Sequence, residues 1–271
     1  MGSGAPRRYH TSVCLIAFST GVGENIIVLA ANRDEYYARR TMRASAWADA
    51  PEVWGGRDLE AGGTWLALSR TGRLAAVTNM RGPARERGER SRGNLCRDFV
   101  TGSADAATYA RRVIAEQTHY ADFNLLVHDG RSLQYANRVL SAPVRVVPAV
   151  HGLSNAALDV PWPKVVRATA ALRAALQGPA DALVGALFAM LADRQGAPNE
   201  ELPGTGISLE AERDLAPIFI PSAVYGTRAS TVIVWRRDGH VSFEERSFGP
   251  EGVAMGVVRE ELVLPALDRG T

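Results

Sequence analysis

Short apolar runs separated by glycine-containing turns dominate the first third of the chain. Two of them flank the segment Gly21–Asn25 and predict a β-hairpin of strands Val13–Phe18 and Ile26–Ala31. The two glycines of that segment supply the positive φ angles that a tight turn needs. A second hairpin is predicted from strands Thr64–Ser69 and Arg73–Asn79, which are joined by three turn residues.

Apolar residues spaced three and four apart predict helices in the middle of the chain. These helices cover Ser91–Val100, Asp105–Gln117, Pro161–Leu176 and Ala180–Ala192. Further strands are predicted at Phe123–His128, Leu133–Asn137 and Val144–Val147, with a last hairpin of Ser230–Trp235 and Val241–Phe248 around Asp238–Gly239. Strands and paired helices do not alternate in a strict βαβ rhythm. The pattern therefore favours an α+β fold of antiparallel sheets with helices packed outside.

Composition excludes several classes of protein. Of 271 residues, 46% are apolar and 22% are charged, which is typical of one globular domain and not of a disordered chain. The net charge of +2 gives no electrostatic footprint for nucleic acid, and no apolar run is long enough for stable membrane insertion. The two cysteines and five scattered histidines form no disulfide framework and no metal site. A cytoplasmic location is the default expectation, because no secretory signal precedes Cys14.

Arginine makes up nearly all of the basic residues, since Lys164 is the single lysine among 31 lysines and arginines. With so much alanine, this bias indicates a GC-rich genome. Residues 81–92 carry five arginines. This segment is either a solvated loop or a flap that brings arginines to an anionic ligand. Residues 195–206 form a turn-rich loop.

Polar residues gather where several predicted strands end. They are Asn32-Arg33-Asp34-Glu35, Thr78-Asn79-Met80-Arg81, Leu153-Ser154-Asn155 and Tyr225-Gly226-Thr227-Arg228. Two glycine pairs, Gly55-Gly56 before Arg57 and Gly62-Gly63 before Thr64 and Trp65, allow close approach of the backbone to a ligand or another strand. Layered sheets build binding sites from such strand ends.

Taken together, these motifs resemble the NRDE family, whose animal members are called transport and Golgi organisation protein 2. The resemblance rests on CLIAF, NRDE, GGRDLEAGGTWLALS, TNMR, SRG, HGLSNA with DVPWPK, and YGTRAST, in that order from Cys14 to about Phe248. It implies an N-terminal-nucleophile (Ntn) hydrolase-like fold, a four-layer αββα sandwich. We therefore expect one domain over residues 13–265, with the strand that begins at Val13 inside its sheet, preceded by a disordered leader or misassigned start at 1–12.

The resemblance also implies a site. In cysteine-type Ntn enzymes such as the choloylglycine hydrolases, the first strand begins with the catalytic cysteine, which matches Cys14. Asp34 matches the aspartate that contacts the α-amino group of that cysteine, Asn79 and Asn155 match the oxyanion site, and Arg228 matches an arginine near the thiol. We expect these five to converge, with Cys14 and Arg228 within about 12 Å at Cα. Candidate ligand-binding residues are Asn32, Arg33, Glu35, Arg57, Trp65 and Arg81.

A cysteine at the start of the chain uses its own α-amino group as general base, so no histidine motif is needed. We expect Arg33 or Arg228 to lower the pKa of the Cys14 thiol. Twelve residues and Val13 precede Cys14. Three explanations are open: the leader is cleaved, the family is not catalytic, or the start is misassigned. We favour the third, because a GTG codon for valine also initiates translation; a start at Val13 with methionine removal would leave Cys14 first. Arg33 and Asp34 should point to opposite faces of the strand, and Arg33 should either pair with an acid such as Asp58 in the opposite layer or swing around the strand end.

Two functions remain open at this point. One is a hydrolase or acyltransferase acting on an amide or thioester, which needs no cofactor. The other is a non-catalytic carrier that holds haem, an acyl-CoA or another lipid in the same cleft, since animal and bacterial relatives have been linked to haem trafficking and lipid metabolism. Haem propionates would pair with guanidinium groups. Without the resemblance, Cys14 would be a small buried apolar residue at a strand start.

Overall fold

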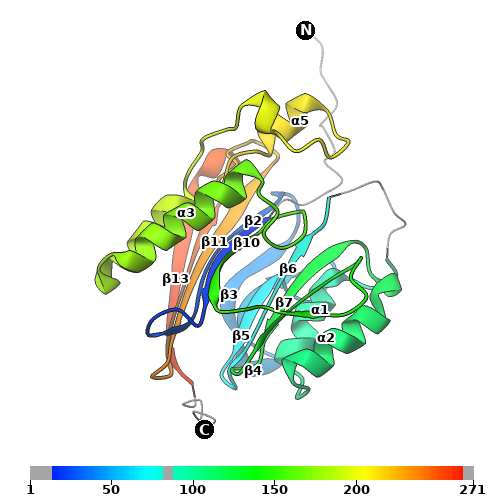
Figure 1. Cartoon of the computed structure of the whole chain (residues 1–271), viewed down its shortest axis with the longest axis vertical. Helices are drawn as coiled ribbons and strands as arrows, with labels where there is room; N and C mark the ends of the chain where they lie inside the picture. Colours follow the sequence, from blue (N-terminus) through cyan, green and yellow to red (C-terminus); the bar gives the residue numbers. More distant parts are fainter. Residues whose placement is uncertain (1–13, 82–87, 265–271) are drawn as a thin grey trace.

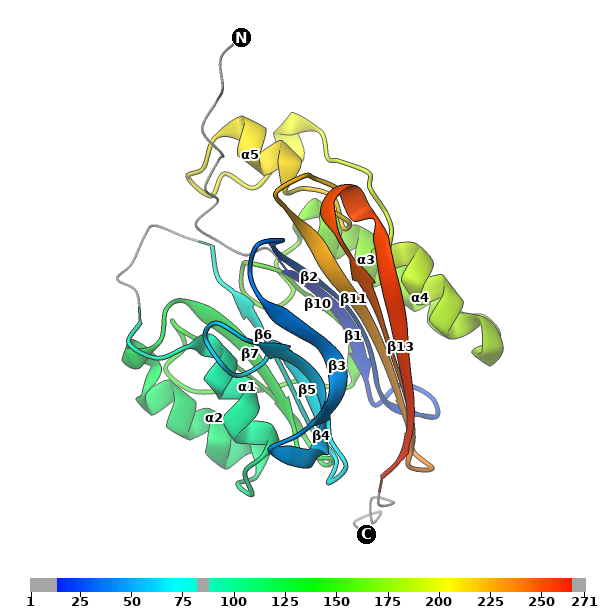
Figure 2. The ribbon, with the colours of Figure 1, turned by 180° about the vertical axis from the view of Figure 1, so that it is seen from behind.

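Two antiparallel sheets face each other in the computed structural model, which describes residues 14–81 and 88–264. The first sheet has six strands in the order β10-β1-β2-β11-β12-β13 and the second has seven in the order β3-β4-β5-β6-β7-β8-β9 (Figures 1 and 2). The first contains β1 (Cys14–Thr20), β2 (Asn25–Tyr36), β10 (Ala149–Leu153), β11 (Tyr225–Arg236), β12 (His240–Phe248) and β13 (Ala254–Val263). The second contains β3 (Thr41–Trp47), β4 (Ala50–Asp58), β5 (Leu66–Ser69), β6 (Arg73–Asn79), β7 (Phe123–His128), β8 (Leu133–Asn137) and β9 (Val144–Arg145).

Helices cover the outer face of each sheet, which makes the fold a four-layer αββα sandwich. On the seven-stranded sheet lie α1 (Arg92–Val100) and α2 (Ala106–Ala115); on the six-stranded sheet lie α3 (Pro163–Gln177) and α4 (Leu183–Leu191). Between the sheets, Phe18, Leu29, Leu68 and Ile233 belong to one buried cluster. Burial of alternate residues on both faces of a strand needs cover on both sides, and the helices supply it.

The periodicity predicted several elements correctly. Strands β6, β7 and β8 have the predicted bounds, and α1 begins after Ser91, whose side chain caps it by accepting a hydrogen bond from the Gly93 amide. The β1–β2 turn contains Gly21 and Gly23 at φ 66° and 58°, as expected. Strand β1 is inside its sheet, between β10 and β2. The predicted segment 1–12, the predicted strand start Val13, residues 82–87 of the arginine-rich loop and the part of the predicted domain beyond residue 264 lie outside the described residues.

The prediction that the second strand ends at Ala31 is wrong. Strand β2 continues to Tyr36, so that Asn32, Arg33, Asp34 and Glu35 lie within it and pair with β1 and β11. Four polar residues in a row are typical of a turn, but here each side chain meets a partner on its own face of the sheet. Likewise, Tyr225–Arg228 begins β11 and does not end a strand.

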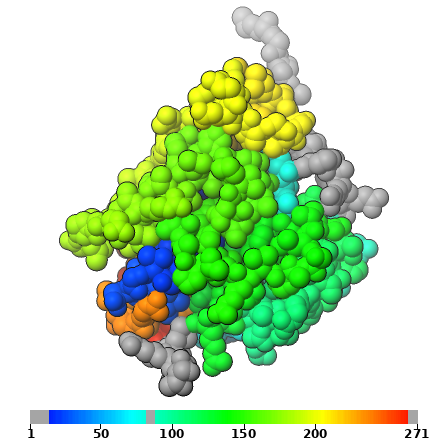
Figure 3. Space-filling view, in the orientation of Figure 1, coloured from blue at the N-terminus to red at the C-terminus, as the bar shows by residue number. Residues whose placement is uncertain are grey.

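Five elements were not predicted: β3, β4, β10, β13 and the short helix α5 (Leu209–Asp214). The pairing of β3 with β4 shifts register twice, which breaks the alternation of apolar residues. Strand β13 is mostly exposed and has only Leu262 buried, because it is at the edge of its sheet. Helix α5 lies beyond one end of the sandwich, and in Figure 3 it adjoins the helical layer of α3.

Over the residues that the structure describes, no helix is both long enough and apolar enough to cross a membrane.

Candidate functional site

Cys14 is the first described residue of β1, and it lies directly opposite Arg33 in the β1–β2 ladder. Its side chain shares a face with Ile16 and Phe18, so it points between the two sheets. The residue is 9% exposed. Its carbonyl accepts a hydrogen bond of 2.9 Å from the Ser154 hydroxyl, which attaches the start of β1 to the segment that follows β10.

The Cys14 thiol is protonated at neutral pH. Burial raises its pKa to about 12, and the Asp34 carboxylate adds to this shift, while the Asp34 backbone amide and the Arg33 charge oppose it. The Arg33 charge acts to lower the pKa, as expected, but desolvation outweighs it and the net shift is upward. Nucleophilic chemistry at this thiol would need a base to take its proton.

Asp34 lies on the opposite face of β2 from Arg33 and is fully buried. Its Oδ1 accepts a hydrogen bond of 2.6 Å from the Thr227 hydroxyl on the neighbouring strand β11. Its Oδ2 has no hydrogen-bond partner among the described residues. Burial raises the pKa of Asp34, and the charge of Lys164 is the strongest influence against that rise. A buried carboxylate oxygen without a donor is costly, so this position is suited to receive a positively charged group.

Asn79 and Asn155 are brought together beside this strand end. The Asn155 side-chain amide donates to the Asn79 carbonyl at 2.8 Å, and the Arg81 backbone amide donates to the Asn155 carbonyl at 2.6 Å. The Thr78 hydroxyl donates to the carbonyl of Ser154, the residue whose hydroxyl donates to the Cys14 carbonyl. The ends of β6 and β10 are therefore joined to β1 by a continuous hydrogen-bonded network.

The expected pair of Arg33 with Asp58 does not form; Asp58 pairs with Arg39 at 2.7 Å instead. The Arg33 guanidinium lies over the Trp65 ring, 4.2 Å from its centroid, and 3.7 Å from the Glu35 carboxylate. Glu35 is two residues along the same strand and so shares the face of Arg33. Glu35 therefore serves as the acidic partner of Arg33, and no acid from the second sheet is needed.

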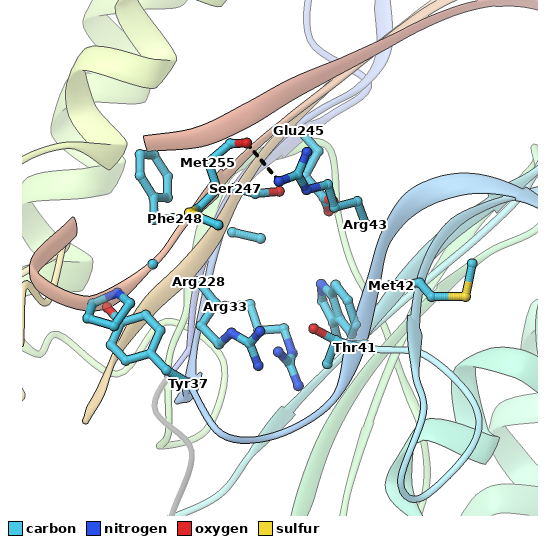
Figure 4. Close-up of a pocket in the computed structure, with 14 residues that line it drawn as sticks. Arg33, Tyr37, Thr41, Met42, Arg43, Arg228, Glu245, Ser247, Phe248 and Met255 are labelled. Atoms are coloured by element: carbon cyan, nitrogen blue, oxygen red, sulfur yellow. Dashed lines mark hydrogen bonds between the residues drawn. The ribbon is translucent and has the colours of Figure 1, made fainter. Parts of the chain in front are cut away.

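A cavity of about 230 Å³ opens beside Arg33, between β2, β11 and β12 on one side and β3 on the other (Figure 4). Arg33 and Arg228 enter it from neighbouring strands, and Arg43 lies at its far side, donating to the Met255 carbonyl. The register of β11 shifts between Thr227 and Ala229, which turns Arg228 toward this space. Buried Glu245 is the acid that lines the cavity.

Arg228 uses its guanidinium to donate to the backbone carbonyls of Tyr36 and Arg39. Cys14 and Ala229 face Arg33 from its two sides, which puts their Cα atoms two strand spacings, or about 10 Å, apart. Arg228 thus belongs to the cavity beside the cysteine, and Arg33 with Trp65 stands next to both.

The other predicted ligand-binding residues are distributed differently. Asn32 is buried under the helical layer, where it donates to the carbonyls of Leu191 and Ile218. Arg57 pairs with Asp49 and stacks on Trp47, on the outer side of the second sheet and away from Cys14. Arg81 makes a buried ion pair with Glu212 at 2.8 Å.

Three residues near Cys14 were not predicted. Thr227 donates a hydrogen bond to Asp34. Lys164 is buried, and its charge interacts with Asp34 and Cys14. Burial lowers the pKa of Arg92, and the charges of Cys14 and Glu35 oppose that shift. Each belongs to a segment that the family resemblance contains: YGTRAST, DVPWPK and SRG. The signal was therefore present in the motifs, but residue type alone did not connect it to this site.

Comparison with known proteins identifies relatives over most of the chain. The family model for Transport and Golgi organisation 2 matches residues 13–250. The chain is 38% identical to the Transport and Golgi organization protein 2 homolog of Bos taurus and 34% identical to that of Homo sapiens, each over 241 residues, which cover 82% of this chain and 86% of the relative.

Among solved structures, the chain is similar to a mutant conjugated bile acid hydrolase from Clostridium perfringens, with a TM-score of 0.49, 9% identity and 92% of both chains covered. It is also similar to the Caenorhabditis elegans ortholog of N-acylethanolamine-hydrolyzing acid amidase, with a TM-score of 0.43, 12% identity, 82% of this chain and 92% of that chain covered. The sequence relatives carry the assignment: the chain belongs to the Transport and Golgi organisation 2 family.

Proposed function

We propose that this protein is a cysteine hydrolase or acyltransferase that cleaves an amide or thioester, with Cys14 as its nucleophile. The observation that supports it most is the buried Asp34 carboxylate, whose Oδ2 has no hydrogen-bond donor within the described structure. In the antiparallel β1–β2 ladder Cys14 lies opposite Arg33, so Asp34 lies level with the position just before Cys14, on the side of its backbone nitrogen. A free α-amino group on Cys14 would be in reach of that oxygen, and this proposal requires Cys14 to be the first residue.

The chemistry follows from these groups. The neutral α-amino group takes the thiol proton, and the sulfur attacks the carbonyl carbon of the substrate. The C–N or C–S bond of the substrate breaks, and its leaving nitrogen or sulfur takes the proton from the amine. The resulting thioester on Cys14 is cleaved by water in a hydrolase or by an acceptor in a transferase, which restores the thiol. Asn79 is the candidate donor to the oxyanion, a contribution of about 3 kcal/mol to the transition state.

The experiment compares two forms of the protein, one that begins at Cys14 and one with the full chain, on a panel of amides and thioesters. We expect turnover from the form that begins at Cys14, and a loss on the order of 100-fold in Cys14→Ala. The matched control is Cys96→Ala, because Cys96 is the other cysteine and is fully buried under Trp65. Turnover by Cys14→Ala at the rate of the parent form would refute the proposal.

A second candidate is a carrier that binds an anionic amphipathic ligand, haem or an acyl-CoA, in the same region. It is supported by the cavity, where Arg33, Arg43 and Arg228 outnumber the single acid Glu245. Its volume of about 230 Å³ is below the roughly 300–1,000 Å³ of pockets that enclose drug-sized ligands. The cavity would therefore enclose only the anionic end of such a ligand and leave the rest at the surface.

Titration of the full chain with haem and with a long-chain acyl-CoA tests this carrier. Stoichiometric binding without turnover, weakened in Arg228→Gln and unchanged in Arg57→Gln, would favour the carrier over the enzyme. Arg57 is the control because it is also a partly buried arginine but lies on the outer side of the second sheet, where it stacks on Trp47. Equal weakening by both variants would argue for binding to surface charge alone.

A further inference from the structure

The single lysine of this chain is one of its most buried charged residues. All 30 other basic residues are arginine, yet Lys164 is only 3% exposed and lies in the first turn of α3. The bias toward arginine disposes every basic position of this chain to that residue, so a lysine here is informative. The two side chains differ in two ways that matter in a buried site: the ammonium is smaller, and it can lose its proton.

Charged and titratable groups from several elements surround Lys164. Asp34 on β2 is the strongest charge that favours its ammonium form, and Cys14 on β1 also favours it; Arg81 after β6 and Arg167 on α3 oppose it. Glu212 on α5, which lines the same small pocket as Lys164, is already paired with Arg81. The Lys164 ammonium donates to the Leu215 carbonyl at 2.9 Å, which orients it against the segment after α5.

Asp34 needs such a cation. It is fully buried, one of its oxygens accepts from Thr227, and the other has no donor in the described part of the chain. An isolated buried carboxylate takes up a proton instead of keeping its charge. Arg33 lies on the opposite face of β2 and already stacks on Trp65. The segment that follows α5 connects Lys164 to the Asp34 face of β2. Lys164 donates to the Leu215 carbonyl at its start, and the Ile220 amide donates to the Thr227 hydroxyl, which in turn donates to Asp34.

We infer that Lys164 is a positioning residue that keeps Asp34 in its carboxylate form, and so keeps charged the acceptor for the amino group of Cys14. Only the second part of this inference, the role of Asp34 as acceptor for the amino group of Cys14, rests on the proposed function. Lys164 does not touch the substrate; it acts through Asp34. An arginine would bring five donors into a pocket that offers the Leu215 carbonyl as acceptor, which explains why the one lysine is here.

The direct test does not depend on turnover. The full chain labelled with ¹³C at the lysine ε-carbon gives one lysine signal, and its titration by NMR reports Lys164 without any assignment. We expect a midpoint below the ordinary value of 10.5. Asp34→Asn removes the anion that favours the ammonium, so the midpoint should fall by a further one pH unit or about that. Thr227→Val should lower it less, because loss of that hydrogen bond makes Asp34 easier to protonate.

Glu245→Gln is the matched control, since Glu245 is also a buried carboxylate of this sheet but faces Arg33 and Arg43. It should leave the midpoint where it is. A wild-type midpoint at the ordinary value would overturn the inference, as would equal midpoints in the wild type and Asp34→Asn. If Asp34→Asn does not fold, the Thr227→Val titration decides in the same way.

Turnover then tests the second half. Lys164→Met should move the acidic limb of the pH–rate profile to higher pH, because Asp34 then keeps its proton up to a higher pH. A purely structural role would lower the rate without moving the limb. If no form turns over while the NMR midpoint depends on Asp34, the charge pair stands and the proposed hydrolase fails.

Discussion

The Cys14 thiol is bordered by charges of opposite sign, with Arg33 across the strand pair and Asp34 one residue further. Burial and the Asp34 anion both raise the pKa of the Cys14 thiol. Asp34→Asn removes that anion, so the pKa should fall and the thiolate fraction should rise. At about pH 8 the alkylation of Cys14 by iodoacetamide should become several-fold faster in Asp34→Asn. Mass spectrometry separates Cys14 from Cys96. Slower alkylation would mean that Asp34 does not act on the thiol as an anion.

Arg33 contributes mainly to stability, through its stack on Trp65 and its ion pair with Glu35. Arg33→Ala should lower the free energy of unfolding by about 2 kcal/mol, measured in urea. Arg57→Ala is the matched control, because Arg57 also stacks on a tryptophan and pairs with an acid, but its partner Asp49 is exposed. That variant should cost less than about 1 kcal/mol. Equal costs would show that burial adds nothing to the Arg33 stack.

At the scale of elements, the turn before β5 touches the beginning of α1. A Cβ on Gly63 would lie 2.4 Å from the backbone of Gly93, whereas a Cβ on Gly62 would have nothing within 4 Å. Both residues have positive φ, 68° for Gly62 and 77° for Gly63. Gly62→Ala should therefore cost about 1 kcal/mol from backbone strain, and Gly63→Ala clearly more, because α1 must also move.

Urea unfolding measures both glycine variants. A Gly63→Ala variant as stable as Gly62→Ala would mean that the two elements do not approach each other this closely. Such a result would also mean that Arg92, the first residue of α1, lies farther from Cys14 than the structure places it.

Short, fully buried strands, and helices with a clear cap, could be predicted from the sequence. Strands β6 to β8 and the start of α1 belong to this group. Strand β13 could not, since its exposed edge position leaves little apolar alternation, and β2 was cut short because buried charges are normally read as a turn. The charges of β2 are accommodated by a hydrogen bond from Thr227 on β11, by the charge of Lys164 on α3 and by the Trp65 ring just before β5, all remote in sequence.

The site itself was predictable in part. Polar motifs at predicted strand ends indicated Asp34, Asn79 and Asn155, whereas Cys14 was indicated by the family resemblance alone. The structure brings these residues to one end of the sandwich. Which face each side chain occupies was predictable for Arg33 and Asp34 from the alternation of a strand. The partner of Arg33 was not, because the choice between Asp58 and Glu35 depends on how β3 and β4 fold.

At the scale of the whole molecule, stability depends on the core between the two sheets. Leu68 is fully buried there, in a strand of the second sheet, while Leu59 is 46% exposed just after β4. Leu68→Ala should cost about 2–5 kcal/mol by creating a cavity between the sheets. Leu59→Ala should stay within about 0.5 kcal/mol. Thermal and urea unfolding measure both variants; a small Leu68 effect would mean that the sheets close over the lost volume.

The burial of Lys164 also makes the molecule an unusual target for amine chemistry. Apart from the chain terminus, a protein with one lysine has a single site for reagents such as activated esters, and here that amine is covered beside the segment after α5. Acylation of Lys164 then requires that cover to lift. The rate at which Lys164 gains the mass of one acyl group would report how often this end of the sandwich opens, without the introduction of a probe.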